Sequence, residues 1–160
     1  MQTFRSKLCD DSSSELAIQQ IQSLNLTRVI NKLVNVAGWL KDDAETTAKL
    51  YQNYLILLKR YRNEYSNLPP SEDIDEFWHN HILDTEAYIE DCKKIFGRYL
   101  HHNPFDGSGD KTEQENFHKA FEITQALHLQ EFGKYIEATR SKYPKFIYYL
   151  LKKFEIIFTS

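Results

Sequence analysis

The spacing of apolar residues is the feature that most restricts how this chain can fold. Along most of its length, apolar residues recur at intervals of three and four rather than two, which is the period of an amphipathic α-helix. Only five Gly and four Pro interrupt the 160 residues, so long helical segments meet few breaks. We therefore expect an all-α fold: a compact single-domain bundle of about six to seven helices over residues 13–160, preceded by a polar leader at 1–12.

Capping and breaking residues indicate where these helices begin and end. The longest apolar stripe should form the centre of the core, with Asp42 or Asp43 as its N-cap. Thr112 and Glu115 have the spacing of a capping box, and Gly97 is suited to end the helix before it. The predicted helices cover residues 14–24, 26–37, 42–65, 73–83 (restarted by Ser71 after Pro69 and Pro70), 85–96, 112–133 and 144–160.

The last predicted helix, residues 144–160, is amphipathic. Five large apolar side chains recur at helical spacing between lysines, and Pro144 suits the first turn. Such a helix can dock on its own domain, on a partner protein or on an anionic membrane surface. Docking on its own domain is favoured, because five large apolar residues left in water would form an unusually large exposed patch.

Charge and composition exclude several classes of partner. The 20 basic and 23 acidic residues give a net charge of -3 without a basic block, so we expect no nucleic-acid ligand. The N-terminus lacks the apolar run of a secretory signal, and no stretch approaches the roughly 18 apolar residues of a transmembrane helix. A cytoplasmic location is expected, where Cys9 and Cys92 should not form a disulfide.

One stretch, residues 73–105, carries most of the side chains suited to chemistry. It holds four of the six histidines together with Cys92 and Trp78. On a helix Asp75 and His79 share one face, so the carboxylate can orient the imidazole. His79 and His81 are two residues apart and point about 200° away from each other, so at most one of them should bind a given ion.

Together these residues form a candidate zinc or iron site. Its predicted ligands are Asp75, His79, Asp91, Cys92 and one or both of His101 and His102, supported by Trp78, His81, Tyr88 and Gly97. The alternative is a protein-interaction module in which the same His and Asp side chains form a structural hydrogen-bond network. Phosphate-loop, dinucleotide-binding and nucleophile-elbow motifs are absent from the sequence, and no reaction can be assigned.

The same stretch contains a multi-part pattern of residues. The segments W-H-x-H-I-L-D-T, Y-x-x-D-C and F-G-x-x-L-H-H-x-P follow one another between residues 78 and 104. This combination resembles the glycine-rich-domain-containing-protein-like family of plants, fungi and bacteria. The resemblance implies a small helical domain of unassigned biochemical role, and the matching positions are Asp75, Trp78, His79, His81, Tyr88, Asp91, Cys92, Gly97 and His101.

Overall fold

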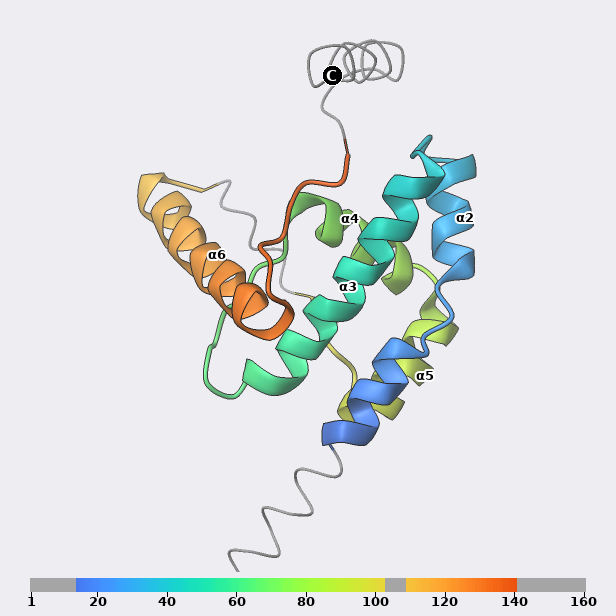
Figure 1. Cartoon of the computed structure of the whole chain (residues 1–160), viewed down its shortest axis with the longest axis horizontal. Coiled ribbons are helices and arrows are strands. Elements are labelled where there is room, and N and C mark those ends of the chain that lie inside the picture. The colour runs from blue at the N-terminus through green and yellow to red at the C-terminus, as the bar shows by residue number, and fades with distance from the viewer. Residues whose placement is uncertain (1–13, 103–108, 141–160) are drawn as a thin grey trace, which may run out of the picture.

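A computed structural model describes residues 14–102 and 109–140 of the chain (Figure 1). Within these ranges there are helices and loops but no strand, which confirms the all-α prediction. The described residues contain five complete helices rather than the six to seven expected; the predicted helix at 144–160 and the leader at 1–12 lie outside them. The helices are α2 (Thr27–Asn35), α3 (Lys41–Tyr61), α4 (Glu72–Ile82), α5 (Thr85–Phe96) and α6 (Lys111–Phe132), and residues 14–22 are also helical.

Helix α3 lies at the centre of the fold. It runs through the middle of the molecule in Figure 1 and packs against α2, α4 and α6, while α4 also contacts α2 and α5. Between Thr47 and Leu58 its buried side chains point to all sides of the helix. The prediction that this stripe forms the centre of the core is confirmed; the buried residues of α3 are Ala44, Thr47, Ala48, Leu50, Tyr51, Tyr54, Leu55, Ile56, Leu57 and Leu58.

The helix ends agree only in part with the caps expected from sequence. Gly97 and Gly133 follow α5 and α6 in left-handed conformation, with φ of 67° and 73°, because glycine adopts this region without a steric penalty. The predicted capping box at Thr112 is wrong. Helix α6 is capped by Asp110, whose carboxylate accepts from the first free backbone N–H groups of the helix and so starts it earlier.

Helix α3 also begins before the predicted cap. Its N-cap residue is Leu40, and Asp42 and Asp43 lie within the first turn. There their negative charges interact favourably with the positive end of the helix dipole. Ser71 does cap α4, because its hydroxyl accepts from the backbone N–H of Ile74 at 3.5 Å.

The segment that follows α6, residues 133–140, is held across the bundle by side chains, and we call it the strap. Gln125 of α6 bonds both backbone groups of Ile136: its amide nitrogen donates to the carbonyl at 2.9 Å and its oxygen accepts from the N–H at 2.7 Å. The buried His128 bonds the Lys134 carbonyl at 2.7 Å through Nδ1. These bonds give the strap a defined path without a ladder of backbone hydrogen bonds.

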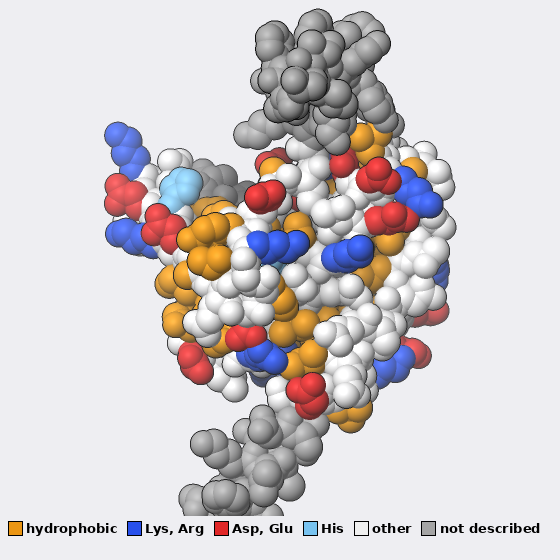
Figure 2. All heavy atoms as spheres, in the orientation of Figure 1, with side chains coloured by type: hydrophobic (Ala, Val, Ile, Leu, Met, Phe, Trp, Pro, Cys, Tyr) orange, Lys and Arg blue, Asp and Glu red, His pale blue; other side chains and the backbone are white. Residues whose placement is uncertain are grey.

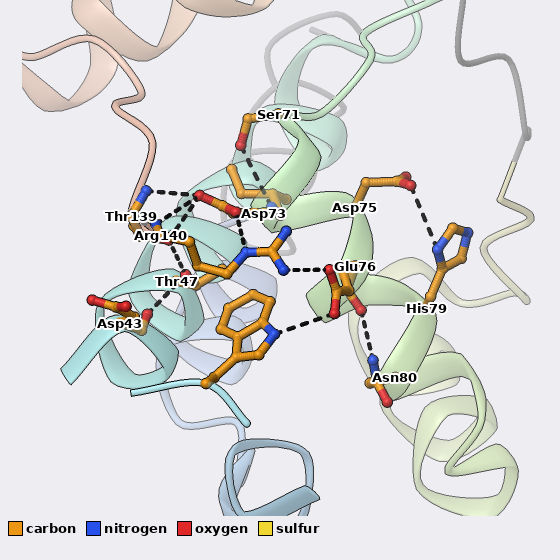
Figure 3. Close-up of polar contacts among 12 residues, drawn as sticks. Asp43, Thr47, Ser71, Asp73, Asp75, Glu76, His79, Asn80, Thr139 and Arg140 are labelled. Atoms are coloured by element: carbon orange, nitrogen blue, oxygen red, sulfur yellow. Dashed lines mark hydrogen bonds and ion pairs between the residues drawn. The ribbon is translucent and has the colours of Figure 1, made fainter. Parts of the chain in front are cut away.

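Asp73 anchors the end of the strap to α4 (Figure 3). Its side chain is 8% exposed and accepts hydrogen bonds from the backbone N–H groups of Thr139 and Arg140, from the Thr139 hydroxyl and from Arg140 Nε. The guanidinium also pairs with Glu76 at 2.7 Å and stacks over the ring of Trp39. Burial raises the pKa of Asp73, but the hydrogen bonds from Arg140 and Thr139 outweigh it and lower the pKa below its ordinary value.

The surface is mixed in character. On the face drawn in Figure 2, acidic and basic side chains are interspersed, with apolar side chains between them. Over α6 and the strap the exposed large apolar residues are Ile123, Leu129 and Tyr135. Within the described ranges, no helix combines the length and the apolar character needed to cross a bilayer.

Replacing Asp73 tests the anchor of the strap. Asp73→Asn removes the charge and turns one acceptor oxygen into an NH₂ group facing donors, so the free energy of unfolding should fall by about 2–4 kcal/mol. Denaturant unfolding at neutral pH measures this. The control is Asp42→Asn, at an exposed position in α3, which removes only an interaction with the helix dipole and should change stability by less than about 1 kcal/mol. Equal effects of the two substitutions would contradict an anchoring role.

His128 should make folding stability depend on pH. Its Nδ1 must donate to the Lys134 carbonyl, which leaves Nε2 to accept from the Asn53 amide at 3.2 Å, and this second bond requires the neutral ring. Burial lowers the pKa of His128, so the unfolded state takes up a proton first, below its ordinary pKa of about 6.5. The free energy of unfolding should therefore decrease as the pH falls below that value.

Denaturant unfolding at pH 7.5 and pH 5.5 checks this dependence. The difference in unfolding free energy between the two conditions should shrink in His128→Gln, which has no group that titrates there. It should persist in His118→Gln, where the original side chain is exposed. A His128→Gln protein with the wild-type difference would exclude His128 as the source.

Candidate metal site

Helix α4 directs its two histidines to opposite environments. His79 has a side chain that is 51% exposed, whereas that of His81 is 3% exposed. A separation of two residues on a helix requires this divergence. The structure therefore contains two separate groups of polar side chains rather than one: an exposed group around Asp75 and a buried group around His81.

The exposed group consists of Asp75, His79 and His102, and we call it the Asp75 cluster. Asp75 and His79 lie one helical turn apart, with Oδ2 and Nδ1 separated by 3.5 Å (Figure 3). His102 comes from the segment after α5, and its Nε2 lies 2.7 Å from Asp75 Oδ1. Within the described part of the chain, these three residues offer one nitrogen or oxygen ligand atom each, all within 4.8 Å of one another.

The rings around His102 hold its imidazole at this position. The indole of Trp78 meets it edge to face with ring centroids 4.4 Å apart, and the ring of His79 lies at the same distance on α4. The His102 side chain is 12% exposed, so its ring is largely enclosed, while Asp75 is 34% exposed. The cluster thus opens to solvent on the side of His79 and Asp75.

The buried group joins α3, α4 and α5. The Tyr51 hydroxyl lies 3.0 Å from His81 Nδ1, and His81 Nε2 lies 3.3 Å from Asp91 Oδ2. An ionised Asp91 can only accept, so Nε2 carries the proton and Nδ1 accepts from Tyr51. Burial lowers the pKa of His81, although Asp91 partly offsets this, and the neutral ring satisfies both partners.

Cys92 lies beside this buried group as a free thiol and is 3% exposed. Burial raises its pKa, which keeps it protonated at neutral pH. Interactions with the Leu100 backbone and the Tyr88 hydroxyl reduce this effect without overcoming it. The other cysteine, Cys9, lies outside the described residues.

The structure distributes the predicted ligand set over both groups. It brings Asp75, His79 and His102 together, and between the two paired histidines it places His102 in the cluster. His101 is exposed and packs on the ring of Tyr99, with centroids 4.9 Å apart. Asp91 and Cys92 were expected to converge with Asp75, but α5 turns them toward His81 and Leu100 instead.

Tyr51 is the one partner of these groups that sequence reasoning assigned only to the core. It lies 30 residues before His81, on a different helix, and its aromatic ring fits the apolar stripe of α3. The available signal was indirect: a buried histidine needs a hydrogen-bond partner for each ring nitrogen. Only the packing of α3 against α4 shows which hydroxyl supplies one.

Removing the Tyr51 hydroxyl tests the buried group. Tyr51→Phe leaves His81 Nδ1 buried without a donor, so the free energy of unfolding should fall by about 1–3 kcal/mol. Tyr99→Phe is the control, because Tyr99 is 39% exposed and its change should stay within about 0.5 kcal/mol. Urea unfolding of the two variants provides the measurement, and a Tyr51→Phe protein as stable as the wild type would rule out the bond.

Comparisons with known proteins identify relatives for most of this structure. The UCP032817-like family model matches residues 18–145. Two curated relatives from Arabidopsis thaliana are each 31% identical: glycine-rich domain-containing protein 2 over 86 residues and protein 1 over 80 residues, or 52% and 50% of this chain. The chain spans only 11% and 10% of their lengths, and no solved structure matches.

These relatives confirm the predicted relationship to glycine-rich domain-containing proteins. Their printed names state no reaction, ligand or partner. The family match includes α2 to α6, and with them both polar groups of α4. Because the family model matches residues 18–145, well over half of this chain, the chain belongs to the UCP032817-like family.

Proposed function

We propose that this domain binds one divalent transition metal ion, Zn²⁺ or Fe²⁺, through Asp75, His79 and His102. The observation that carries the proposal is the convergence of two imidazole nitrogens and one carboxylate oxygen within 4.8 Å. Imidazole and carboxylate are donors that both metals accept. Two of the donors lie on one rigid helix, and the third is brought to them from residue 102 by the tertiary fold.

The spacing of the donor atoms fits a metal at the centre of the cluster. Ligand atoms bound to zinc at about 2.0–2.1 Å in a tetrahedron lie about 3.3 Å from one another. The distances from Asp75 to His79 and His102, 3.5 Å and 2.7 Å, lie on either side of this value. Side-chain rotations that bring the three donor atoms, which lie within 4.8 Å of one another, to this spacing would place all of them around one ion.

Three protein donors leave at least one coordination position for water or another ligand. Catalytic zinc sites and the two-histidine, one-carboxylate iron sites share this property, whereas structural zinc sites are closed by four protein ligands. The exposure of His79 and Asp75 gives an incoming molecule access to that position. The proposal therefore favours an open, exchangeable metal site over a closed structural one.

Metal content of protein purified without an affinity tag tests the proposal. After loading with Zn²⁺, or with Fe²⁺ without oxygen, the wild type should retain about one equivalent by elemental analysis. His79→Ala, His102→Ala and Asp75→Asn should each retain less than about a tenth of an equivalent. Because His79 is half-exposed, His79→Ala should leave the melting temperature of the metal-free protein almost unchanged.

His101→Ala is the matched control for the ligand assignment. It removes the neighbouring histidine, which is exposed and outside the Asp75 cluster, and should retain the full equivalent. A wild-type protein that holds less than about a tenth of an equivalent would disprove metal binding. Loss of the metal in His101→Ala but not in His102→Ala would disprove the choice of His102.

A further inference from the structure

His102 lies on a segment without regular structure, which must be fixed by tertiary contacts. Helix α5 ends at Phe96, and the chain reverses at Gly97 into residues 98–102. Leu100, in the middle of this segment, is 1% exposed. Its backbone N–H and C=O groups cannot reach water, so each needs a partner from the protein.

Two side chains of α5 contact this backbone. The Tyr88 hydroxyl donates to the Leu100 carbonyl at 2.7 Å, and the Leu100 backbone interacts with the Cys92 sulfur. Tyr88 and Cys92 are four residues apart and therefore lie on the same face of the helix. This face of α5 thus contacts the backbone of a residue only two positions before His102.

Trp78 connects this arrangement to the Asp75 cluster. Its indole N–H donates to the Tyr88 oxygen at 2.9 Å, which directs the phenolic proton toward the Leu100 carbonyl. The same indole packs edge to face against His102. One side chain of α4 therefore supports both the residue that fixes the segment and the imidazole that the segment carries.

We propose that Tyr88, with Cys92, is a positioning residue for His102: by holding the backbone of Leu100 it presets the imidazole against Asp75. The expected consequence, tighter metal binding, rests on the proposed metal function. A ligand held in place before the ion arrives loses less conformational entropy on binding. Cys92 then acts through the backbone and does not need to touch the ion.

A matched pair of tyrosines tests the proposal. Tyr88→Phe and Tyr54→Phe each remove one buried hydroxyl that donates to a backbone carbonyl, at 2.7 Å to Leu100 and at 2.8 Å to Leu68. Zinc affinity, measured by competition with a chelator, should fall about 10- to 100-fold in Tyr88→Phe. It should stay within about threefold of wild type in Tyr54→Phe, because general destabilisation does not displace His102.

A second measurement does not need the metal. In the metal-free protein the imidazole protons of His102 should show an NMR shift caused by the Trp78 ring current, given the 4.4 Å ring separation. The shift should diminish in Tyr88→Phe and persist in Tyr54→Phe. A wild type that binds no zinc would overturn the metal assignment alone, and this NMR comparison would still decide whether Tyr88 positions His102.

Two substitutions at Cys92 provide a further test with a conservative rescue. Cys92→Ser keeps an acceptor for the Leu100 backbone, whereas Cys92→Ala removes it. The His102 shift and the zinc affinity should be closer to wild type in Cys92→Ser than in Cys92→Ala. The proposal is overturned if Tyr88→Phe and Tyr54→Phe have equal effects, or if Cys92→Ala leaves the His102 shift unchanged.

Discussion

Burial of the second half of α3 on all of its sides is the constraint on which the rest of the structure depends. A helix with apolar side chains around its whole circumference must be covered from several directions, and α2, α4 and α6 provide this cover. The polar groups of α3 that are buried in the process need partners. Tyr51 forms a hydrogen bond with His81, Tyr54 with the Leu68 carbonyl and the half-buried Asn53 with His128. These bonds specify which part of the chain packs at each position along α3.

The packing of helix α4 against α3 orients the residues of the proposed site. Its inner face carries Phe77, Trp78 and His81 into the core against α3. Its outer face then presents Asp75 and His79 to solvent one turn apart. Asp73 and Glu76 near its start hold the strap through Arg140, so both sides of the helix are fixed by contacts with other parts of the chain (Figure 3).

The histidines of this domain illustrate how environment decides the role of a residue type. His81 and His128 are enclosed, bond through both ring nitrogens and are kept neutral because burial lowers their pKa. His79 and His102 share an oxygen-rich partner, Asp75, near the surface. His81 and His128 use both nitrogens for structural bonds, whereas His79 and His102 each direct a nitrogen toward Asp75, which is 34% exposed.

Local sequence determined the helices, because apolar period, proline breaks and terminal glycines act within a few residues of chain. It also determined that Asp75 pairs with His79 and that His81 must point elsewhere, since both follow from helical geometry alone. The tertiary structure alone decided that His102 rather than His101 meets Asp75 and that Asp91 faces His81. Both placements depend on how α5 packs and on the turn at Gly97. They are set by contacts between different elements of the fold, which outweigh the helix preferences of the local sequence.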